Sequence, residues 1–268
     1  MTVADPVQAS TRAAAHARAR QRFDAHRRAF AANATLRDLY AGWYDRLGRH
    51  RPARTLGPTV EVGSGPGFAR DFLEDVVLTD VVAAPWLELL AAGEALPFAP
   101  ASVGALILFD VLHHLPSPAR FFAEAERVLA PGGRILICDP YISPLSYPIY
   151  AWLHEEGVDF SHDAFAPFGD ESAEVPTGND PFAGNQAVAT QLFFRRLPRF
   201  QQRFPRLRVV VRERLAGPTY PMTGGFGRRA LLPRFVLQRL LRWEMSWPAA
   251  AYRWVGFRTL VVLELAGP

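Results

Sequence analysis

The sequence predicts an α/β protein built on a Rossmann-like, doubly wound and mostly parallel sheet. Short apolar runs alternate with helix-forming stretches between Thr59 and Asp139, which is typical of βαβ units. A glycine-rich turn follows the first apolar run, and two further apolar runs come late in the chain. We therefore expect N-terminal helices, a parallel core, a late antiparallel strand, and a substrate cap of helices and loops.

The expected elements follow in chain order from local patterns. Residues 12–50 are expected to be helical, with Thr35 and Asp38 forming a capping box at a helix start. Apolar runs bounded by turn residues predict strands at residues 59–62, 76–80, 103–109, 134–139, 207–215 and 257–265. Helix-start and helix-stop residues predict helices at residues 67–74, 85–92, 118–130, 185–196 and 230–247.

These elements divide the chain into three parts. Residues 1–54 would form an N-terminal helical segment and residues 55–140 a ligand-binding Rossmann-like core. Residues 141–268 would supply the cap insertions together with the last two core strands. Within the cap, residues 169–184 have the composition of a loop or lid.

Composition excludes several classes of protein. All 30 basic residues are arginine, so enzymes that depend on a Schiff-base, P-loop or Tyr/Lys-type lysine are excluded. The single cysteine, Cys138, can form no internal disulfide. No apolar run approaches the roughly 20 residues that span a bilayer, and the N-terminus lacks an apolar signal core. We expect a cytoplasmic, bacterial-like globular protein with ample apolar residues for a sizeable core.

Charge is distributed unevenly along the chain. Residues 55–194 carry a net charge of −15, whereas residues 195–258 carry +13. The basic segment could pack against the acidic one, because opposite fields favour docking without any ligand. Alternatively, it could receive an anionic substrate, an acidic lipid surface or RNA.

The sharpest motif is the glycine-rich turn after the first predicted strand. Gly63, Gly65 and Gly67 permit a tight turn and let a ligand lie directly against the backbone. The spacing is one residue shorter than in dinucleotide-binding turns. Glu61 would suit a cationic ligand and repel a pyrophosphate, and Asp80 is placed to accept both hydroxyls of a ribose.

These motifs resemble those of class I S-adenosylmethionine-dependent methyltransferases, in particular the type 11, ubiquinone-biosynthesis-like group that acts on small molecules. The matching segments are residues 61–67, Asp80, residues 94–98, residues 109–115 and residues 126–133. Five motifs in the same order over some eighty residues carry the resemblance. It implies an enzyme that moves a methyl group from S-adenosylmethionine to a small organic acceptor and releases S-adenosylhomocysteine.

The resemblance also implies which residues bind the cofactor. The cofactor-binding residues would be Glu61, Gly63, Ser64, Gly65, Gly67, Asp80, Val81, Glu94, Ala95, Leu96, Phe109 and Asp110. The glycine turn would face the methionine part, with Glu61 near its ammonium group. Asp80 and Val81 would hold the ribose, and the segment before Leu96 would flank the adenine.

Two positions depart from the pattern of the family. Ala92 stands where the family has an aspartate that bonds the adenine amino group, and Gly104 replaces an aspartate at the start of a strand. Glu94 could substitute for the first of these. The alternative reading is a non-catalytic, nucleoside-binding or regulatory relative, and an RNA methyltransferase is a further, weaker one.

Methyl transfer depends mainly on holding donor and acceptor in line, and an oxygen acceptor also needs a base to take its proton. We expect O-methylation of an apolar molecule that is anionic or lipid-linked. The candidate bases are His154, Glu155 and His114, although a solvated helix end or a cofactor-edge position would explain them equally well. No metal-ligand cluster is evident in the sequence, so no metal is expected.

Residues 230–247 combine leucines, Phe235, Trp243 and Trp247 with arginines in a helical pattern. Such a helix can cover the core with its arginine stems, lie on an anionic membrane, or bind a partner helix. Basic and aromatic residues at 193–204 would permit RNA binding, but no RNA-binding module is recognisable. The sequence leaves the oligomeric state open.

Overall fold

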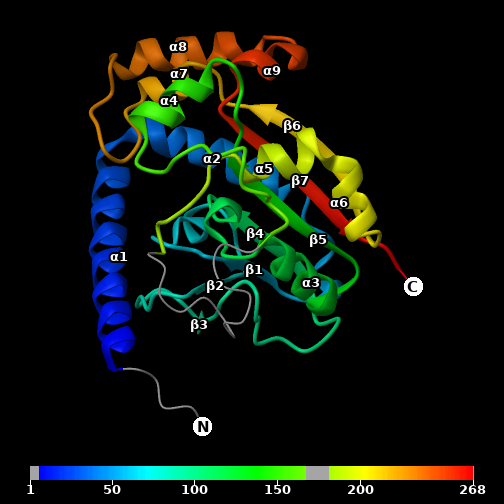
Figure 1. Cartoon of the computed structure of the whole chain (residues 1–268). Coiled ribbons are helices and arrows are strands. Elements are labelled where there is room, and N and C mark those ends of the chain that lie inside the picture. The colour runs from blue at the N-terminus through cyan, green and yellow to red at the C-terminus, as the bar shows by residue number, and fades with distance from the viewer. Residues whose placement is uncertain (1–5, 167–180, 268) are drawn as a thin grey trace.

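A computed structural model describes residues 6–166 and 181–267 and contains one mixed sheet (Figure 1). In the described residues the sheet has seven strands in the order β3-β2-β1-β4-β5-β7-β6. The predicted fold class is therefore confirmed. No helix in the described part of the chain is both long and apolar enough to cross a membrane.

The parallel part of the sheet comprises β1 (Thr59–Val62), β2 (Val76–Asp80), β3 (Leu89–Leu90), β4 (Val103–Phe109) and β5 (Leu129–Pro140). Strands β1, β2, β4 and β5 end at one edge of the sheet, because β1 pairs in parallel with β2 and β4, and β4 with β5. This carboxyl edge is where ligands bind in open α/β sheets.

Two antiparallel strands complete the sheet on the β5 side. They are β6 (Leu207–Leu215) and β7 (Arg258–Leu265), and β7 lies between β5 and β6. Both strands occur where the apolar runs predicted them. As a result, the first residue of β7 lies at the carboxyl edge, opposite the last residue of β5.

Strand side chains alternate between two apolar layers. Leu106 and Leu108 of β4 pack with α3 (Pro118–Val128), whereas Ile107 packs with α2 (Ala34–Gly48). Because both faces are covered, β4 is buried at every position, which explains why its sequence is a continuous apolar run.

The N-terminal region is helical, as expected, but its cap differs from the prediction. Helix α1 (Pro6–Ala32) is followed directly by α2, whose N-cap is Asn33. The Asn33 side-chain oxygen Oδ1 accepts a hydrogen bond from the Leu36 amide, while Thr35 is buried within the first turn. The capping box predicted at Thr35 and Asp38 is therefore wrong. An Asn at this position meets the same need to satisfy free amides.

Two predicted helices are absent or shortened around β2. Residues 67–74 contain only a short 3₁₀ turn, η2 (Phe68–Asp71). Residues 85–92 form bends and β3 rather than a helix, because the Glu88 and Ala91 amides bond to carbonyls of β2. A chain of so few residues between two paired strands has no room for a packed helix.

The remaining helices lie outside the parallel core. They are η1 (Arg54–Leu56), η3 (Leu112–His114), α4 (Ser146–Leu153), α5 (Val188–Thr190) with the π-helical turn η4 (Gln191–Arg195), α6 (Leu197–Arg203), α7 (Thr219–Met222), α8 (Arg234–Met245), η5 (Ala249–Ala251) and α9 (Tyr252–Val255). Helices α4, α7, α8 and α9 gather at one end of the molecule (Figure 1). Most of the predicted lid at residues 169–184 lies outside the described residues.

The Asn33 cap can be tested by mutation. Asn33→Ala should lower the free energy of unfolding by about 1 kcal/mol, because it removes the acceptor that satisfies the Leu36 amide. Urea denaturation measures the change. Asn33→Asp keeps the acceptor and should stay close to the parent protein. Equal losses in the two variants would show that the hydrogen bond from Asn33 to the Thr223 carbonyl, and not the cap, is what matters.

Candidate functional site

The glycine-rich turn between β1 and η2 adopts a left-handed backbone at each glycine. The φ angles of Gly63, Gly65 and Gly67 are 68°, 49° and 76°. A side chain is disfavoured at such angles, which accounts for glycine at all three positions. Ser64 instead anchors the turn, since its amide and hydroxyl both bond to Thr79 of β2 and the hydroxyl donates to the Glu61 carbonyl. Ser64 therefore holds the turn through its side chain.

Glu61 is buried beneath this turn with one oxygen left without a partner. Its Oε1 accepts a hydrogen bond from the Tyr44 hydroxyl at 2.7 Å, whereas its Oε2 has no partner in the structure. Burial raises the pKa of Glu61 to about 7. A buried carboxylate with spare hydrogen-bonding capacity fits a cationic amino group placed over the turn.

Asp80, at the end of β2, ties two loops together. Its Oδ2 accepts from the Gly65 amide and its Oδ1 from the Val82 amide, each at 2.8 Å. Burial raises the pKa of Asp80. Each carboxylate oxygen keeps a second lone pair, so the group can still accept a pair of hydroxyls. The neighbouring Val81 side chain is exposed beside it.

Helix α1 clamps the glycine turn from outside. The Trp86 indole donates to the Gly65 carbonyl at 2.9 Å, and its ring lies between the guanidinium groups of Arg20 and Arg27. Arg27 also donates to the Pro66 carbonyl at 2.6 Å. Phe23 of the same helix lies against Gly65. The N-terminal helix thus closes one side of the site, a role that the sequence did not indicate.

The segment expected to flank an adenine is held by acidic side chains. Glu94 accepts a hydrogen bond from the Ser117 amide at 3.1 Å, so its carboxylate points to the start of α3. Leu96 is buried, and its amide and carbonyl bond to Glu124 and Arg127. Ala95 bonds through its amide to the Ala92 carbonyl.

Phe109 is placed differently from the expectation. Its ring stacks on that of Tyr44 with centroids 4.5 Å apart, inside the aromatic layer under α2. Its side chain packs the core, so it does not line a ligand-binding surface. The alternation of side chains along β4 turns Phe109 toward this layer.

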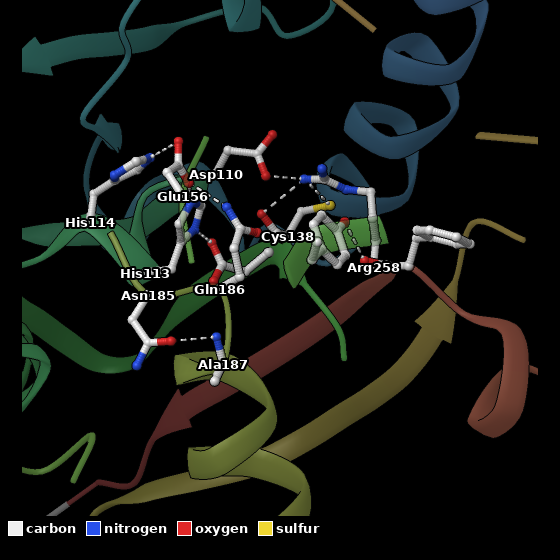
Figure 2. A network of polar contacts seen from close by, with 12 residues as sticks. Asp110, His113, His114, Cys138, Glu156, Asn185, Gln186, Ala187 and Arg258 are labelled. Carbon is white, nitrogen blue, oxygen red and sulfur yellow. Dashed lines mark hydrogen bonds and ion pairs between the residues drawn. The ribbon is translucent and has the colours of Figure 1, made fainter. Parts of the chain in front are cut away.

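Asp110 follows β4 with a left-handed backbone and pairs with a buried arginine. Its φ angle is 56°, and its Oδ1 lies 2.5 Å from the Arg258 guanidinium (Figure 2). Arg258 is 2% exposed and lies over the rings of Trp43 and Phe109. The same guanidinium donates to the Cys138 carbonyl. The pair fixes the turn after β4 to the start of β7.

Beyond Asp110, this turn carries His113 and His114, which meet Asp139 of β5 and Glu156 after α4; we call these four residues the histidine–carboxylate cluster. His113 Nδ1 lies 2.9 Å from Asp139 Oδ1, and its Nε2 lies 3.1 Å from Glu156 Oε2. His114 Nε2 lies 3.7 Å from Glu156 Oε1 (Figure 2). The Gln186 amide also bonds to Glu156.

The cluster perturbs the pKa values of its members. Burial opposes a charge on His113, but Asp139 and Glu156 outweigh it and raise the pKa of His113 to about 10. Burial and the neighbouring His113 lower the pKa of His114 to about 4. Although burial opposes its charge, the histidines lower the pKa of Glu156 to about 2. Clustered, perturbed groups at a carboxyl edge are typical of functional sites.

Of the three predicted bases, only His114 lies in this cluster. His154 is at the exposed end of α4, and the exposed Glu155 pairs with Arg22 of α1. The next residue, Glu156, is the one that turns inward. Sequence reasoning missed Asp139, Gln186 and Arg258, and it placed Glu156 in the run with His154 and Glu155 without choosing it as the base. Asp139 had a usable signal, since it ends a strand as Asp80 does, whereas Glu156 and Gln186 lie on irregular segments whose direction no periodicity reveals.

Comparisons with known proteins find a methyltransferase domain in the part of the chain that carries the glycine turn. Residues 60–137 match the family model described as "Methyltransferase domain". A curated protein of Mycolicibacterium smegmatis, described as a "Probable S-adenosylmethionine-dependent methyltransferase", is 30% identical over 112 residues. That match covers 36% of this chain and 42% of the relative, so the chain spans less than half of the relative's length.

Solved structures also align over most of the chain. A SAM-dependent methyltransferase of Thermotoga maritima is 11% identical, with 92% of this chain and 98% of that one covered and a TM-score of 0.49. The YcgJ protein of Bacillus subtilis is 13% identical, with 85% and 99% covered and a TM-score of 0.45.

The Asp110–Arg258 pair can be tested by removing its carboxylate. Asp110→Ala should lower the free energy of unfolding by about 3 kcal/mol, because the Arg258 guanidinium would stay buried without its counter-charge. The matched control is Asp45→Ala, which breaks the exposed pair with Arg49 and should cost under about 1 kcal/mol. Similar values for both variants in urea denaturation would contradict a special role for the pair.

Proposed function

We propose that this chain, whose residues 60–137 belong to the methyltransferase domain family, transfers a methyl group from S-adenosylmethionine to a small organic acceptor. The observation that carries the proposal is the partnerless Oε2 of Glu61 under the left-handed glycine turn. The methionine part of the cofactor offers a cationic amino group, which would supply the partner that this oxygen lacks.

The residues of the chain then have distinct tasks in binding. Glu61 holds the amino group, and Gly63 and Gly65 allow the methionine part to lie on the turn. Asp80 accepts the ribose hydroxyls, and Val81 lies beside them. When bound, the cofactor supplies an activated methyl group, so the chief contribution of the protein is to position an acceptor in line with it.

We infer that the acceptor atom is an oxygen whose proton is removed near the histidine–carboxylate cluster. The cluster follows directly from the turn after β4, and Val111 of that turn lies against the site of Gly63. Of the bases named from sequence, His114 is the one that lies in the cluster, with His154 and Glu155 outside it. The net charge of +13 on residues 195–258 would attract an apolar acceptor that is anionic or lipid-linked.

The alternative is a non-catalytic relative that binds a nucleoside. Its support is the position of Glu94, whose carboxylate is engaged by the Ser117 amide rather than free to replace the missing adenine contact at Ala92. Binding with no turnover on any acceptor would favour this alternative. Binding of S-adenosylhomocysteine with RNA as the sole acceptor would favour the RNA methyltransferase.

Cofactor binding is tested by calorimetry with S-adenosylhomocysteine. Gly65→Leu should reduce the affinity at least a hundredfold, because the φ of 49° disfavours any side chain and a leucine would press against Phe23 of α1, so the turn would lose the shape that holds the methionine part. The matched control, Gly42→Ala, adds a methyl group on α2 where nothing lies within 4 Å, and should leave binding unchanged. Failure of the parent protein to bind at millimolar ligand would refute the proposed function.

A second test uses the titration of Glu61. Its pKa is about 7 without ligand, and a bound ammonium group favours the ionised carboxylate. The affinity for S-adenosylhomocysteine should therefore rise about tenfold from one pH unit below this pKa to one unit above it. Glu61→Gln should bind more weakly and show a flat profile over the same range. A flat profile in the parent protein would remove Glu61 from the binding site.

Some arginines of the basic segment, residues 195–258, form ion pairs, and others form none within the described residues. Arg234 of α8 bonds to Asp38 of α2, and Arg196 and Arg199 both pair with Asp163. These contacts support the reading in which opposite charges dock. By contrast, Arg239 and Arg242 make no ion pair within the described residues.

These free arginines lie among exposed apolar side chains. On α8 the large exposed apolar residues are Phe235, Trp243 and Met245, with Leu231 before this helix and Trp254 on α9 after it. Basic and aromatic groups on one exposed helix are typical of peripheral contact with anionic lipid. This arrangement supports membrane contact or a lipid-linked acceptor.

Charge reversal separates docking from lipid contact. The double variant Arg239→Glu/Arg242→Glu should lose binding to vesicles that contain anionic lipid, with its melting temperature and S-adenosylhomocysteine affinity unchanged. Arg234→Glu should instead lower stability, by about 1 kcal/mol, because it places two carboxylates together. Vesicle binding should weaken as salt rises. Vesicle binding that ignores both salt and the double variant would exclude this surface.

A further inference from the structure

We propose that the histidine–carboxylate cluster binds one divalent transition-metal ion through His113 Nε2, His114 Nε2 and Glu156. These three side chains each present one ligand atom, and all three atoms lie within 4.8 Å of one another. Two imidazoles and one carboxylate at neighbouring coordination positions are a common ligand set for divalent iron and related metals. The other coordination positions of the ion then stay open.

The distances suit a shared ion. Metal–nitrogen and metal–oxygen bonds of about 2.1 Å place neighbouring ligand atoms roughly 3 to 3.5 Å apart. His113 Nε2 and Glu156 Oε2 are separated by 3.1 Å, and His114 Nε2 and Glu156 Oε1 by 3.7 Å. Dashed lines in Figure 2 join the side chains of His113, His114 and Glu156. The two distances end on different oxygens of Glu156, so this carboxylate could hold the ion through one oxygen or through both.

The surrounding residues orient the ligands as an outer shell does. Asp139 is fully buried and holds His113 through Nδ1, and the ion would take the place of the proton that Nε2 shares with Glu156. Gln186, itself 1% exposed, bonds to Glu156 and fixes its direction. A carboxylate behind the metal-binding histidine is the usual arrangement in metal sites, and it raises the basicity of the ligand nitrogen.

Two buried atoms show that the protein alone does not satisfy the cluster. Asp139 Oδ2 and Gln186 Oε1 both lack a hydrogen-bond partner in the structure. The chain also approaches closely here, since a Cβ on Gly184 would lie 2.8 Å from His114 Nδ1. Buried polar atoms without partners are uncommon in native proteins and indicate a missing ligand, ion or water.

The ion also explains how an oxygen acceptor could lose its proton, a point that rests on the proposed function. A divalent charge lowers the pKa of a nearby hydroxyl, so the proton can leave to solvent water before the oxygen attacks the methyl group. In that transfer the O–C bond forms while the C–S bond breaks, and the electron pair remains on sulfur. His114 would then act as a ligand rather than as a free base.

Metal binding is measured on the full chain after chelator treatment, with Co²⁺ as the probe. Calorimetry should give one ion per chain, and the visible absorption of Co²⁺ should report nitrogen and oxygen ligands. Glu156→Gln and His114→Gln should each weaken binding at least a hundredfold, and Asp139→Asn about ten- to a hundredfold. The control His50→Gln changes a histidine after α2 and should bind Co²⁺ like the parent protein.

The outcomes separate this site from the proposed function. Circular dichroism and thermal unfolding of the metal-free variants establish that each one is folded. Absence of stoichiometric Co²⁺ binding, or binding that survives both Glu156→Gln and His114→Gln, overturns the metal site. In either case the binding of S-adenosylhomocysteine remains the test of the proposed function, because these variants do not change Glu61 or the glycine turn. Metal binding without S-adenosylhomocysteine binding would keep the site and refute the proposed function.

Discussion

The ion pair between Arg258 and Asp110 holds together the edge on which the site is built. It joins the first residue of β7 to the turn after β4, and that turn carries Val111 toward Gly63 and the two histidines toward Glu156. A guanidinium buried among aromatic rings is costly to leave without a counter-charge, so the pair constrains both segments. Asp110 has a left-handed backbone conformation, and it makes the ion pair from that conformation.

The two halves of the site differ in how they are made. The glycine turn is held by backbone and short-range contacts, with Ser64, Thr79 and Asp80 fastening two adjacent parallel strands. The histidine–carboxylate cluster instead brings together side chains from three distant segments, at 113–114, 139 and 156. A site for a common cofactor and a site for a particular acceptor would be expected to differ in this way, because acceptor chemistry is set by segments outside the core.

The cap residues give the molecule a charge arrangement that serves two purposes. Arg196 and Arg199 pair with Asp163 of the cap, and Arg234 pairs with Asp38 of α2, so part of the basic segment stabilises the fold. Arg239 and Arg242 remain at the surface among exposed aromatic side chains. The same arginine-rich composition therefore supplies both ion pairs and an exposed, positively charged apolar surface, and the presence of a neighbouring carboxylate decides which arginine does which.

The sequence by itself determined the chain positions of the strands and of the glycine turn, because apolar runs and glycines at left-handed positions are local properties of the chain. Six strands were predicted, and each occurs at or within two residues of its place, apart from an N-terminal extension of β5 and the unpredicted two-residue β3. Local patterns failed at residues 85–92, where pairing with β2 overrode a helix-like composition, and at Thr35, where Asn33 supplies the cap.

Only the tertiary structure decided that Glu156 rather than His154 or Glu155 faces the two histidines, that Phe109 packs under α2, and that α1 closes the glycine turn. Each of these depends on which way an irregular segment or a long-range contact turns a side chain, and no spacing along the chain encodes that direction.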